Sequence, residues 1–113
     1  MKVQLIDICC ARSGDKGPNS NIGLVFYNIE IYNWAKKTLT PRKLKKYFSK
    51  LVLGEIKRYE LDNISALNFV LYNSLGGGGS ESLLNDAQGK THAQTLLLMY
   101  VDLPEEYKDL INE

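Results

Sequence analysis

The six residues LNFVLY, at positions 67–72, decide the fold predicted for this chain. They are mostly apolar and β-favouring, which is typical of a strand at the centre of a sheet. Just before them, Glu55–Leu61 alternates apolar and polar residues, with Ile56, Tyr59 and Leu61 taken as the apolar side. The residues between the two segments, Asp62-Asn63, favour a turn. We therefore predict two strands joined by a turn.

Two further strands are predicted nearer the N-terminus, over Val3–Ala11 and Asn21–Tyr27. They can pair as a hairpin across a loop predicted over Arg12–Asn19, which contains glycine, proline and short polar residues. The spacing of apolar residues predicts a helix over Glu30–Leu39. A second helix is predicted to begin at Thr40-Pro41, because threonine caps free N–H groups and proline fits the first turn.

The C-terminal part is predicted to hold one more helix and one more strand. Asp86 suits the N-cap of a helix from Ala87, and Leu83–Asn85 is expected to be extended. A last strand is predicted near Val101, and the tail after Pro104 has only a weak amphipathic pattern. The order of elements predicts an α+β fold, a mainly antiparallel sheet with helices packed on one face.

Length and composition fit one globular domain. The chain has 113 residues, so we expect a single domain over residues 1–113, with residues 104–113 peripheral. With 44% hydrophobic and 24% charged residues, disordered and fibrous classes are excluded. A net charge of +1 gives no overall field that would select nucleic acid or a membrane, so we expect neither partner. No signal peptide or membrane span is visible, and we expect a cytoplasmic location.

Two local features of the sequence are a basic stretch and a pair of adjacent cysteines. Lys36–Lys50 carries seven basic residues and no acidic one, which indicates either a surface for an anionic partner or a solvated helix face. Cys9 and Cys10 are adjacent, so on a strand their side chains point to opposite faces. No other cysteine is present, which excludes a disulfide scaffold and an all-cysteine metal or iron–sulfur site within one chain. We expect no metal and no other cofactor.

The segment Arg12–Gly17 is the first candidate anion site. Its two glycines permit backbone angles that turn N–H groups inward, and such a concavity binds anions. Arg12 and Lys16 add positive charge where a phosphate or carboxylate could lie. The alternative is a plain hairpin loop in which Asp15 pairs with one of these cations.

Two later segments are further candidates. The four glycines Gly76–Gly79 would allow the backbone to approach a ligand or another chain closely, and a flexible link is the alternative. Asp86–Lys90 opens the predicted helix, whose free N–H groups and dipole favour an anion. Capping by Asp86 is the alternative, and it would occupy the place of the anion.

Candidates for catalysis are weaker. His92 is the only histidine and could serve as a general acid or base, but a histidine in the first turn of a helix is more often a surface residue. No serine or cysteine has a visible base partner, so a nucleophilic triad is not supported. Asp7, Asp15 and Asp86 could bind a hard cation with Asn21 or Asn68, although nothing in their spacing requires it.

Five strings together resemble the AtuA-like domain, the C-terminal module of proteins related to the acyclic terpene utilisation protein AtuA, here as a standalone chain. They are ARSGDKG at 11–17, NIGL at 21–24, ALNFVL at 66–71, LGGGG at 75–79 and DAQGK at 86–90. The resemblance implies a ferredoxin-like sandwich and a link to the catabolism of branched terpenoid acids as coenzyme A thioesters. It implies no catalytic residues, which stay unknown, and His92 and Pro18 depart from its pattern.

The positions that match these motifs are the candidate ligand-binding residues. They are Arg12, Ser13, Gly14, Asp15, Lys16, Gly17, Asn21, Asn68, Gly76, Gly77, Gly78, Gly79, Asp86, Gln88, Gly89 and Lys90.

These observations leave three functional hypotheses. The first is an accessory domain that binds an anionic metabolite such as an acyl-coenzyme A, or that docks on a catalytic partner. The second is a small enzyme, with Asp15 or Asp86 as acid or base and Lys16 or Lys90 as oxyanion stabiliser. The third is an assembly module, and we expect a homo-oligomer because a small α+β sheet often leaves an edge to cover.

Overall fold

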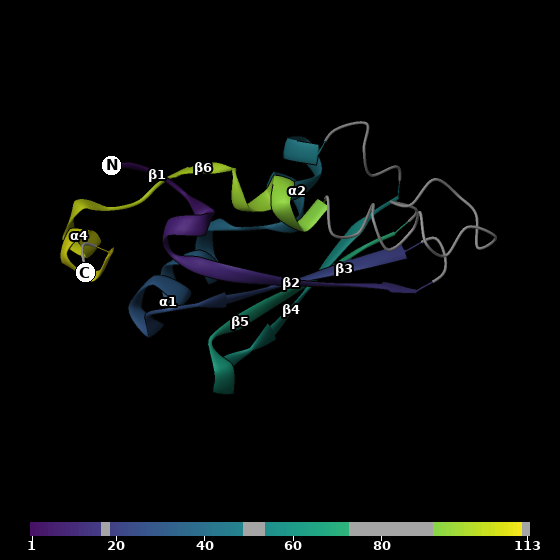
Figure 1. Ribbon diagram of the computed structural model, residues 1–113, viewed down its shortest axis with the longest axis horizontal. Helices are drawn as coiled ribbons and strands as arrows, with labels where there is room; N and C mark the ends of the chain where they lie inside the picture. Colours follow the sequence, from purple (N-terminus) through teal and green to yellow (C-terminus); the bar gives the residue numbers. More distant parts are fainter. Residues whose placement is uncertain (17–18, 49–53, 73–91, 112–113) are drawn as a thin grey trace.

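The computed structural model describes residues 1–16, 19–48, 54–72 and 92–111, and in it an antiparallel sheet packs against helices (Figure 1). The elements in chain order are β1 (Lys2–Gln4), β2 (Cys9–Lys16), β3 (Asn19–Phe26), α1 (Ile29–Thr38), α2 (Pro41–Phe48), β4 (Ile56–Leu61), β5 (Ala66–Leu71), a helix over 92–97, β6 (Tyr100–Asp102) and α4 (Lys108–Ile111). Short 3-10 turns cover Leu5–Asp7, Asp62–Ile64 and Glu105–Tyr107.

The main sheet has four strands in the order β2-β3-β5-β4, and every neighbouring pair is antiparallel. Strand β5 pairs with both β3 and β4, which confirms that the segment at 67–72 is central. Strands β2 and β3 form the predicted hairpin. A separate two-stranded sheet joins β1 to β6, so a strand near Val101 is confirmed as well.

The prediction of a loop over Arg12–Asn19 is wrong. Residues 12–16 continue β2 and Asn19 begins β3, so only positions 17 and 18 separate the two strands. Gly14 and Asp15 pair with Asn21 and Ser20 across the hairpin. Cross-strand pairing therefore overrides the low β propensity of these residues, because propensity is weaker than the hydrogen-bonded ladder of a long hairpin.

The prediction of one continuous strand over Val3–Ala11 is also wrong, because the strand is interrupted in its middle. The 3-10 turn at Leu5–Asp7 divides it into β1 and β2, which belong to different sheets. The backbone N–H of Leu5 donates to the carbonyl of Met99, and the Leu5 side chain is fully buried. The apolar residues of this segment are therefore buried partly in a turn and partly in strands, and apolar character alone did not distinguish the two.

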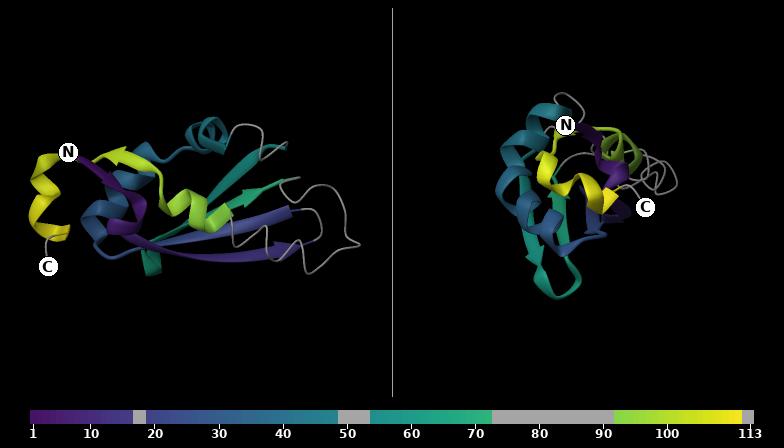
Figure 2. Two further views of the ribbon diagram at one scale, coloured as in Figure 1. Left: turned by 45° about the horizontal axis from the view of Figure 1, so that its top comes forward. Right: turned by 90° about the vertical axis from the view of Figure 1, so that its left-hand side faces the viewer.

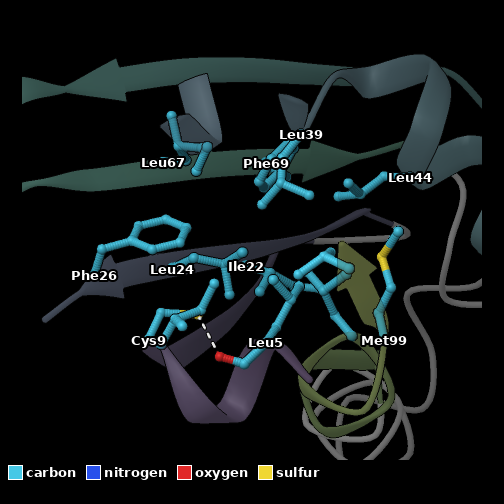
Figure 3. Close-up of a cluster of buried hydrophobic side chains, with 14 of the residues drawn as sticks. Leu5, Cys9, Ile22, Leu24, Phe26, Leu39, Leu44, Leu67, Phe69 and Met99 are labelled. Atoms are coloured by element: carbon cyan, nitrogen blue, oxygen red, sulfur yellow. Dashed lines mark hydrogen bonds between the residues drawn. The ribbon is translucent and has the colours of Figure 1, made fainter. Parts of the chain in front are cut away.

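The helices cover one face of the main sheet (Figure 2), as the sequence predicted. Inward side chains of β3 and β5 alternate with more accessible ones, and they meet the apolar sides of α1, α2 and helix 92–97. Figure 3 shows part of this core. Its members from the sheet include Ile22, Leu24, Phe26, Leu67, Phe69 and Leu71, and those from the helices include Ile31, Tyr32, Ala35, Leu44, Phe48, Ala93 and Leu96.

Local chemistry fixes where the helix α2 begins and how the chain returns to the sheet. The backbone N–H of Lys43 donates to Thr40 Oγ1 at 3.2 Å, so the predicted threonine cap is confirmed. At the return, the backbone N–H of Gly54 donates to the carbonyl of Tyr72 at 3.0 Å. A Cβ at position 54 would lie 2.5 Å from that carbonyl oxygen, so glycine is required there by close approach of two backbones.

Candidate functional site: the open face of the sheet

The face of the main sheet opposite the helices is the candidate functional surface, and we call it the open face. It carries no helix in the part of the chain that the structure describes (Figures 1 and 2). Because side chains alternate along a strand, the antiparallel register aligns open-face residues in rows across the strands. One row reads Arg12, Gly23, Asn68 and Tyr59, and the next reads Gly14, Asn21, Val70 and Lys57.

The row Arg12–Gly23–Asn68–Tyr59 combines a cation, an amide and an aromatic ring around a glycine. Arg12 is exposed, Asn68 is half-buried and the Tyr59 ring is half-exposed. Within the described chain, the side chains of Arg12 and Asn68 have no hydrogen-bond or ion-pair partner. A Cβ at Gly23 would lie 3.6 Å from Asn68 Oδ1, so the glycine leaves a small hollow between the two polar groups.

The second row adds another amide beside another glycine. A Cβ at Gly14 would lie 3.4 Å from Asn21 Oδ1, so the Asn21 amide lies over the glycine backbone. At the far end of the row, Lys57 Nζ lies 3.9 Å from Glu55 Oε1 and 5.8 Å from the centre of the Tyr72 ring. Lys57 is thus partly engaged, whereas the Asn21 amide has no recorded partner among the described residues.

A cavity of about 250 Å³ lies at the end of this face. Its lining residues are Asn19, Ser20, Asn21, Val70 and Tyr72. Ligand pockets that enclose a whole drug-sized molecule measure roughly 300–1,000 Å³. The cavity therefore has room for one group, such as a phosphate or a carboxylate, while the rest of a larger ligand would extend over the open face.

A larger hollow of about 470 Å³ lies elsewhere, and it contains none of the predicted ligand residues. Asp7, Tyr27 and Asn28 line one side, and the C-terminal residues 109–111 line the other. Its charged members, Asp7 and Asp109, are carboxylates, which repel an anion. The open face is therefore the better candidate for an anionic ligand.

The structure brings four predicted residues together on the open face: Arg12, Gly14, Asn21 and Asn68. Ser13 pairs with the inward residue Ile22, so strand alternation directs it away from that face. The backbone of residues 15 and 16 continues β2, but their side chains lie outside the described part. The remaining candidates, Gly17, Gly76, Gly77, Gly78, Gly79, Asp86, Gln88, Gly89 and Lys90, lie outside the described residues, and their convergence on this face stays a prediction.

Sequence reasoning missed Lys57, Tyr59 and Tyr72. It grouped Tyr59 and Leu61 with Ile56, but strict alternation along β4 places Ile56 inward and Lys57, Tyr59 and Leu61 on the open face. The signal was available, because a strand repeats every two residues and positions 57, 59 and 61 share one parity.

Several basic residues on the covered side have structural roles. Arg58 Nη1 donates to the carbonyl oxygens of Lys36 and Leu39, at 2.7 and 2.8 Å, and so binds the C-terminal end of α1. Asp62 Oδ1 accepts from the Tyr32 hydroxyl at 2.7 Å and from Lys36 Nζ at 3.2 Å. These two hydrogen bonds lower the pKa of the Asp62 carboxyl. Part of the basic stretch thus holds the fold together.

His92 is buried, which corrects the expectation of a surface histidine. Its side chain is only 6% exposed, and its ring meets Phe48 edge-on at 5.8 Å. Burial lowers the pKa of the imidazole, and Nδ1 has no hydrogen-bond partner among the described residues. His92 therefore packs with the core on the helix side of the sheet.

The two cysteines lie on opposite faces, as predicted. Cys9 is fully buried and donates to the carbonyl of Leu5 at 3.2 Å, whereas Cys10 is exposed, and neither forms a disulfide. Burial, with a smaller contribution from the neighbouring thiol, raises the pKa of Cys9 to about 12. Across the described ranges, no cluster of histidine, cysteine or acidic residues could hold a metal ion.

An antiparallel sheet with α1, α2 and the helix over 92–97 on one side, as in the described residues, is the architecture of a ferredoxin-like α+β domain. The family model of the AtuA ferredoxin-like domain matches residues 3–102, so this chain belongs to that family. The comparison with curated proteins and the comparison with solved structures each found no match. Of the helices in the described ranges, none is long and apolar enough to cross a membrane.

Proposed function

We propose that this chain is a binding module that holds an anionic metabolite, such as an acyl-coenzyme A, against the open face of its sheet. One observation carries the proposal. The polar side chains of Arg12, Asn21 and Asn68 share this face around Gly14 and Gly23, and none has a protein partner in the described chain. Polar groups that a fold does not use, gathered on one uncovered surface, are available to a ligand.

The charges of the face favour an anion. Its described cations are Arg12 and Lys57, and its described carboxylate, Glu55, lies within 3.9 Å of Lys57. Among the described residues of this face, Arg12 is thus the charge without an opposite charge beside it, and a guanidinium binds a phosphate or carboxylate through paired hydrogen bonds. The nearby cavity of about 250 Å³ offers room for one further group of the ligand.

The alternative of a small enzyme depends on Asp15 or Asp86 as acid or base. The side chains of both lie outside the described part, and no observation on the open face favours that reaction over binding. Docking on a catalytic partner and assembly into a homo-oligomer also stay predictions. The edges of the main sheet, β2 and β4, are where an assembly would extend it.

Titration of the ¹⁵N-labelled chain with coenzyme A and an acyl-coenzyme A tests the proposal. We expect amide shifts at Arg12, Asn21 and Asn68. Arg12→Ala should weaken binding about 10- to 100-fold, because a hydrogen bond to a charged group contributes about 1.5–3 kcal/mol. The matched control is Arg42→Ala, since Arg42 is an exposed arginine on α2. The proposal fails if millimolar ligand causes no shift, or if both variants lose the same affinity.

A further inference from the structure

We infer that the row Arg12–Gly23–Asn68–Tyr59 recognises the adenosine 5′-phosphate part of a nucleotide-type metabolite. This inference rests on the proposed function, because it names the portion of the ligand that the open face would bind. The row runs straight across all four strands, so its groups succeed one another in a fixed order. That order matches base, sugar and phosphate.

Tyr59 supplies a surface for the base. Its side chain is 49% exposed, and its hydroxyl has no recorded hydrogen bond to the described protein. Of the other exposed tyrosines, Tyr47 donates its hydroxyl to the Thr95 carbonyl and Tyr100 has Lys2 Nζ 5.6 Å from its ring centre. Tyr27 lines the separate hollow beside Asp7. An accessible aromatic ring on a strand is a platform on which a nucleobase stacks.

Asn68 lies directly beside Tyr59 in the register of β4 and β5. Neighbouring strands are about 4.8 Å apart, so the amide can reach the edge of a base that is stacked on the ring. An asparagine amide offers one acceptor and two donors, and this pattern pairs with N6 and N7 of adenine. Because the described protein leaves this amide without a partner, base recognition would not break an existing contact.

Gly23 provides the space between base and phosphate. It lies opposite Asn68 on one side and opposite Arg12 on the other. A side chain here would fill the hollow, since a Cβ would lie 3.6 Å from Asn68 Oδ1 and 4.0 Å from the Arg12 carbonyl oxygen. Without it, a ribose can lie close to the sheet.

Arg12 ends the row at the edge strand β2 with an exposed guanidinium. Three strand spacings of about 4.8 Å separate the backbones of Arg12 and Tyr59, roughly 14 Å in all. The long arginine side chain can reach back across Gly23 toward the middle of the row. A phosphate that is attached to a ribose over Gly23 would therefore come within its range.

A single nucleotide fits this surface better than a nucleic acid strand. Binding to a polyanion depends on many lysine and arginine contacts with successive phosphates. The described open face carries only Arg12 and Lys57 as cations, and Glu55 offsets Lys57. The row has one aromatic position, one amide and one cation that has no partner among the described residues, which is enough for one base and one phosphate group.

The test compares AMP, CMP and 4′-phosphopantetheine by NMR titration and calorimetry of the whole chain. Adenosine monophosphate should bind the row and compete with coenzyme A, and CMP should bind more weakly. Tyr59→Leu should lower the affinity for AMP at least fivefold, because stacking is lost. The same variant should leave the affinity for 4′-phosphopantetheine unchanged. Tyr100→Leu is the matched control, since Tyr100 is an exposed tyrosine on β6, and it should change neither ligand. Asn68→Ala should remove the preference for AMP over CMP.

The outcomes separate this inference from the proposed function. If coenzyme A binds at the open face but AMP does not compete with it, the binding module stands and the adenosine assignment falls. Equal losses in Tyr59→Leu and Tyr100→Leu would also overturn the assignment. So would tighter, steeply salt-dependent binding of an oligoadenylate, which would point to nucleic acid. If neither coenzyme A nor AMP binds, the proposed function and the inference fall together.

Discussion

Arg58 and Arg12 lie on opposite faces of the same sheet, and their surroundings differ completely. Arg58 faces the helices, where its guanidinium binds the last carbonyls of α1 and the Glu60 carboxylate at 3.0 Å. Arg12 faces outward, and the described chain offers its guanidinium no partner. The covered face uses its polar groups to close the fold, whereas the open face keeps polar groups that make no hydrogen bond or ion pair with the described residues. Such unused groups are the best guide to function in this molecule.

Cys9 and Cys10 are neighbours in sequence but lie on opposite faces of the sheet, so they test the difference between the covered face and the open face. Raising the pKa of Cys9 from its ordinary 9.0 to about 12 lowers its thiolate fraction by roughly a thousandfold at neutral pH. We expect iodoacetamide at pH 8 to alkylate Cys10 rapidly and to leave Cys9 unmodified, as measured by mass spectrometry of peptides. Cys10→Ser should then abolish labelling of the folded chain. Rapid labelling of Cys9 in that variant would show that the helix side is open to solvent.

A second pair compares packing on the two faces of β5. Phe69→Ala should lower the free energy of unfolding by about 3–5 kcal/mol, because it empties a fully buried position in the core. Val70→Ala, one residue further along, should cost about 1 kcal/mol or less, since Val70 is only half-buried on the open face. Urea denaturation measures both. Equal costs would mean that the open face is packed as tightly as the covered one.

The two arginines form the third pair. Arg58→Ala should lower the free energy of unfolding by about 2 kcal/mol, because it leaves two carbonyls at the end of α1 without their charged donor. Arg12→Ala should change it by less than about 0.5 kcal/mol, as is usual for an exposed side chain that has no partner among the described residues. Thermal unfolding monitored by circular dichroism checks both variants. A large loss in Arg12→Ala would assign that residue to the fold.

His92 predicts a pH dependence on the covered side. Burial holds the pKa of the folded imidazole below the unfolded value near 6.5, so the unfolded chain binds a proton first. Stability should therefore fall as the pH drops below about 6.5 and level off below the folded pKa. Urea midpoints between pH 7.5 and 5 measure the slope. In His92→Leu the slope over this window should be flatter, and an unchanged slope would exclude His92 as its source.

A small effect on stability, within the same limit as for Arg12→Ala, is expected at Gly23. Gly23→Ala should change the free energy of unfolding by no more than about 0.5 kcal/mol, because a Cβ there meets its neighbours at ordinary contact distances. The same variant should weaken binding of AMP by filling the hollow beside Asn68. A variant that is less stable but still binds normally would contradict both expectations. Circular dichroism and NMR titration of one sample give both results.

Much of the fold could be predicted from the sequence because the strands and helices that form the core have clear local patterns of apolar and capping residues. The apolar, β-favouring run of β5, the helical spacing of α1 and the Thr40-Pro41 start of α2 each depend on local rules, and the structure follows them. The hairpin residues 12–16 could not be predicted in this way. Their glycine and short polar side chains favour a turn, and only pairing with β3, a tertiary interaction, holds them in a strand.

The candidate site was predictable in part for the same reason. Arg12, Gly14, Asn21 and Asn68 were selected as motif residues, but their common face follows from the register of three strands, which the sequence did not specify. The position of Tyr59 on the open face could have been predicted only by applying the two-residue alternation strictly along β4. The burial of His92 could not be predicted, because it depends on what packs against the imidazole ring, here Phe48.

The small sheet of β1 and β6 has a consequence for synthesis on the ribosome. Val3 pairs with Val101, so β1 emerges from the ribosome long before β6, the strand with which it pairs. Contacts between such distant positions form late, because closing a long loop costs entropy before the contact is made. Until then, β1 is an unpaired strand edge on a nascent chain, open to chaperones and to other newly made chains.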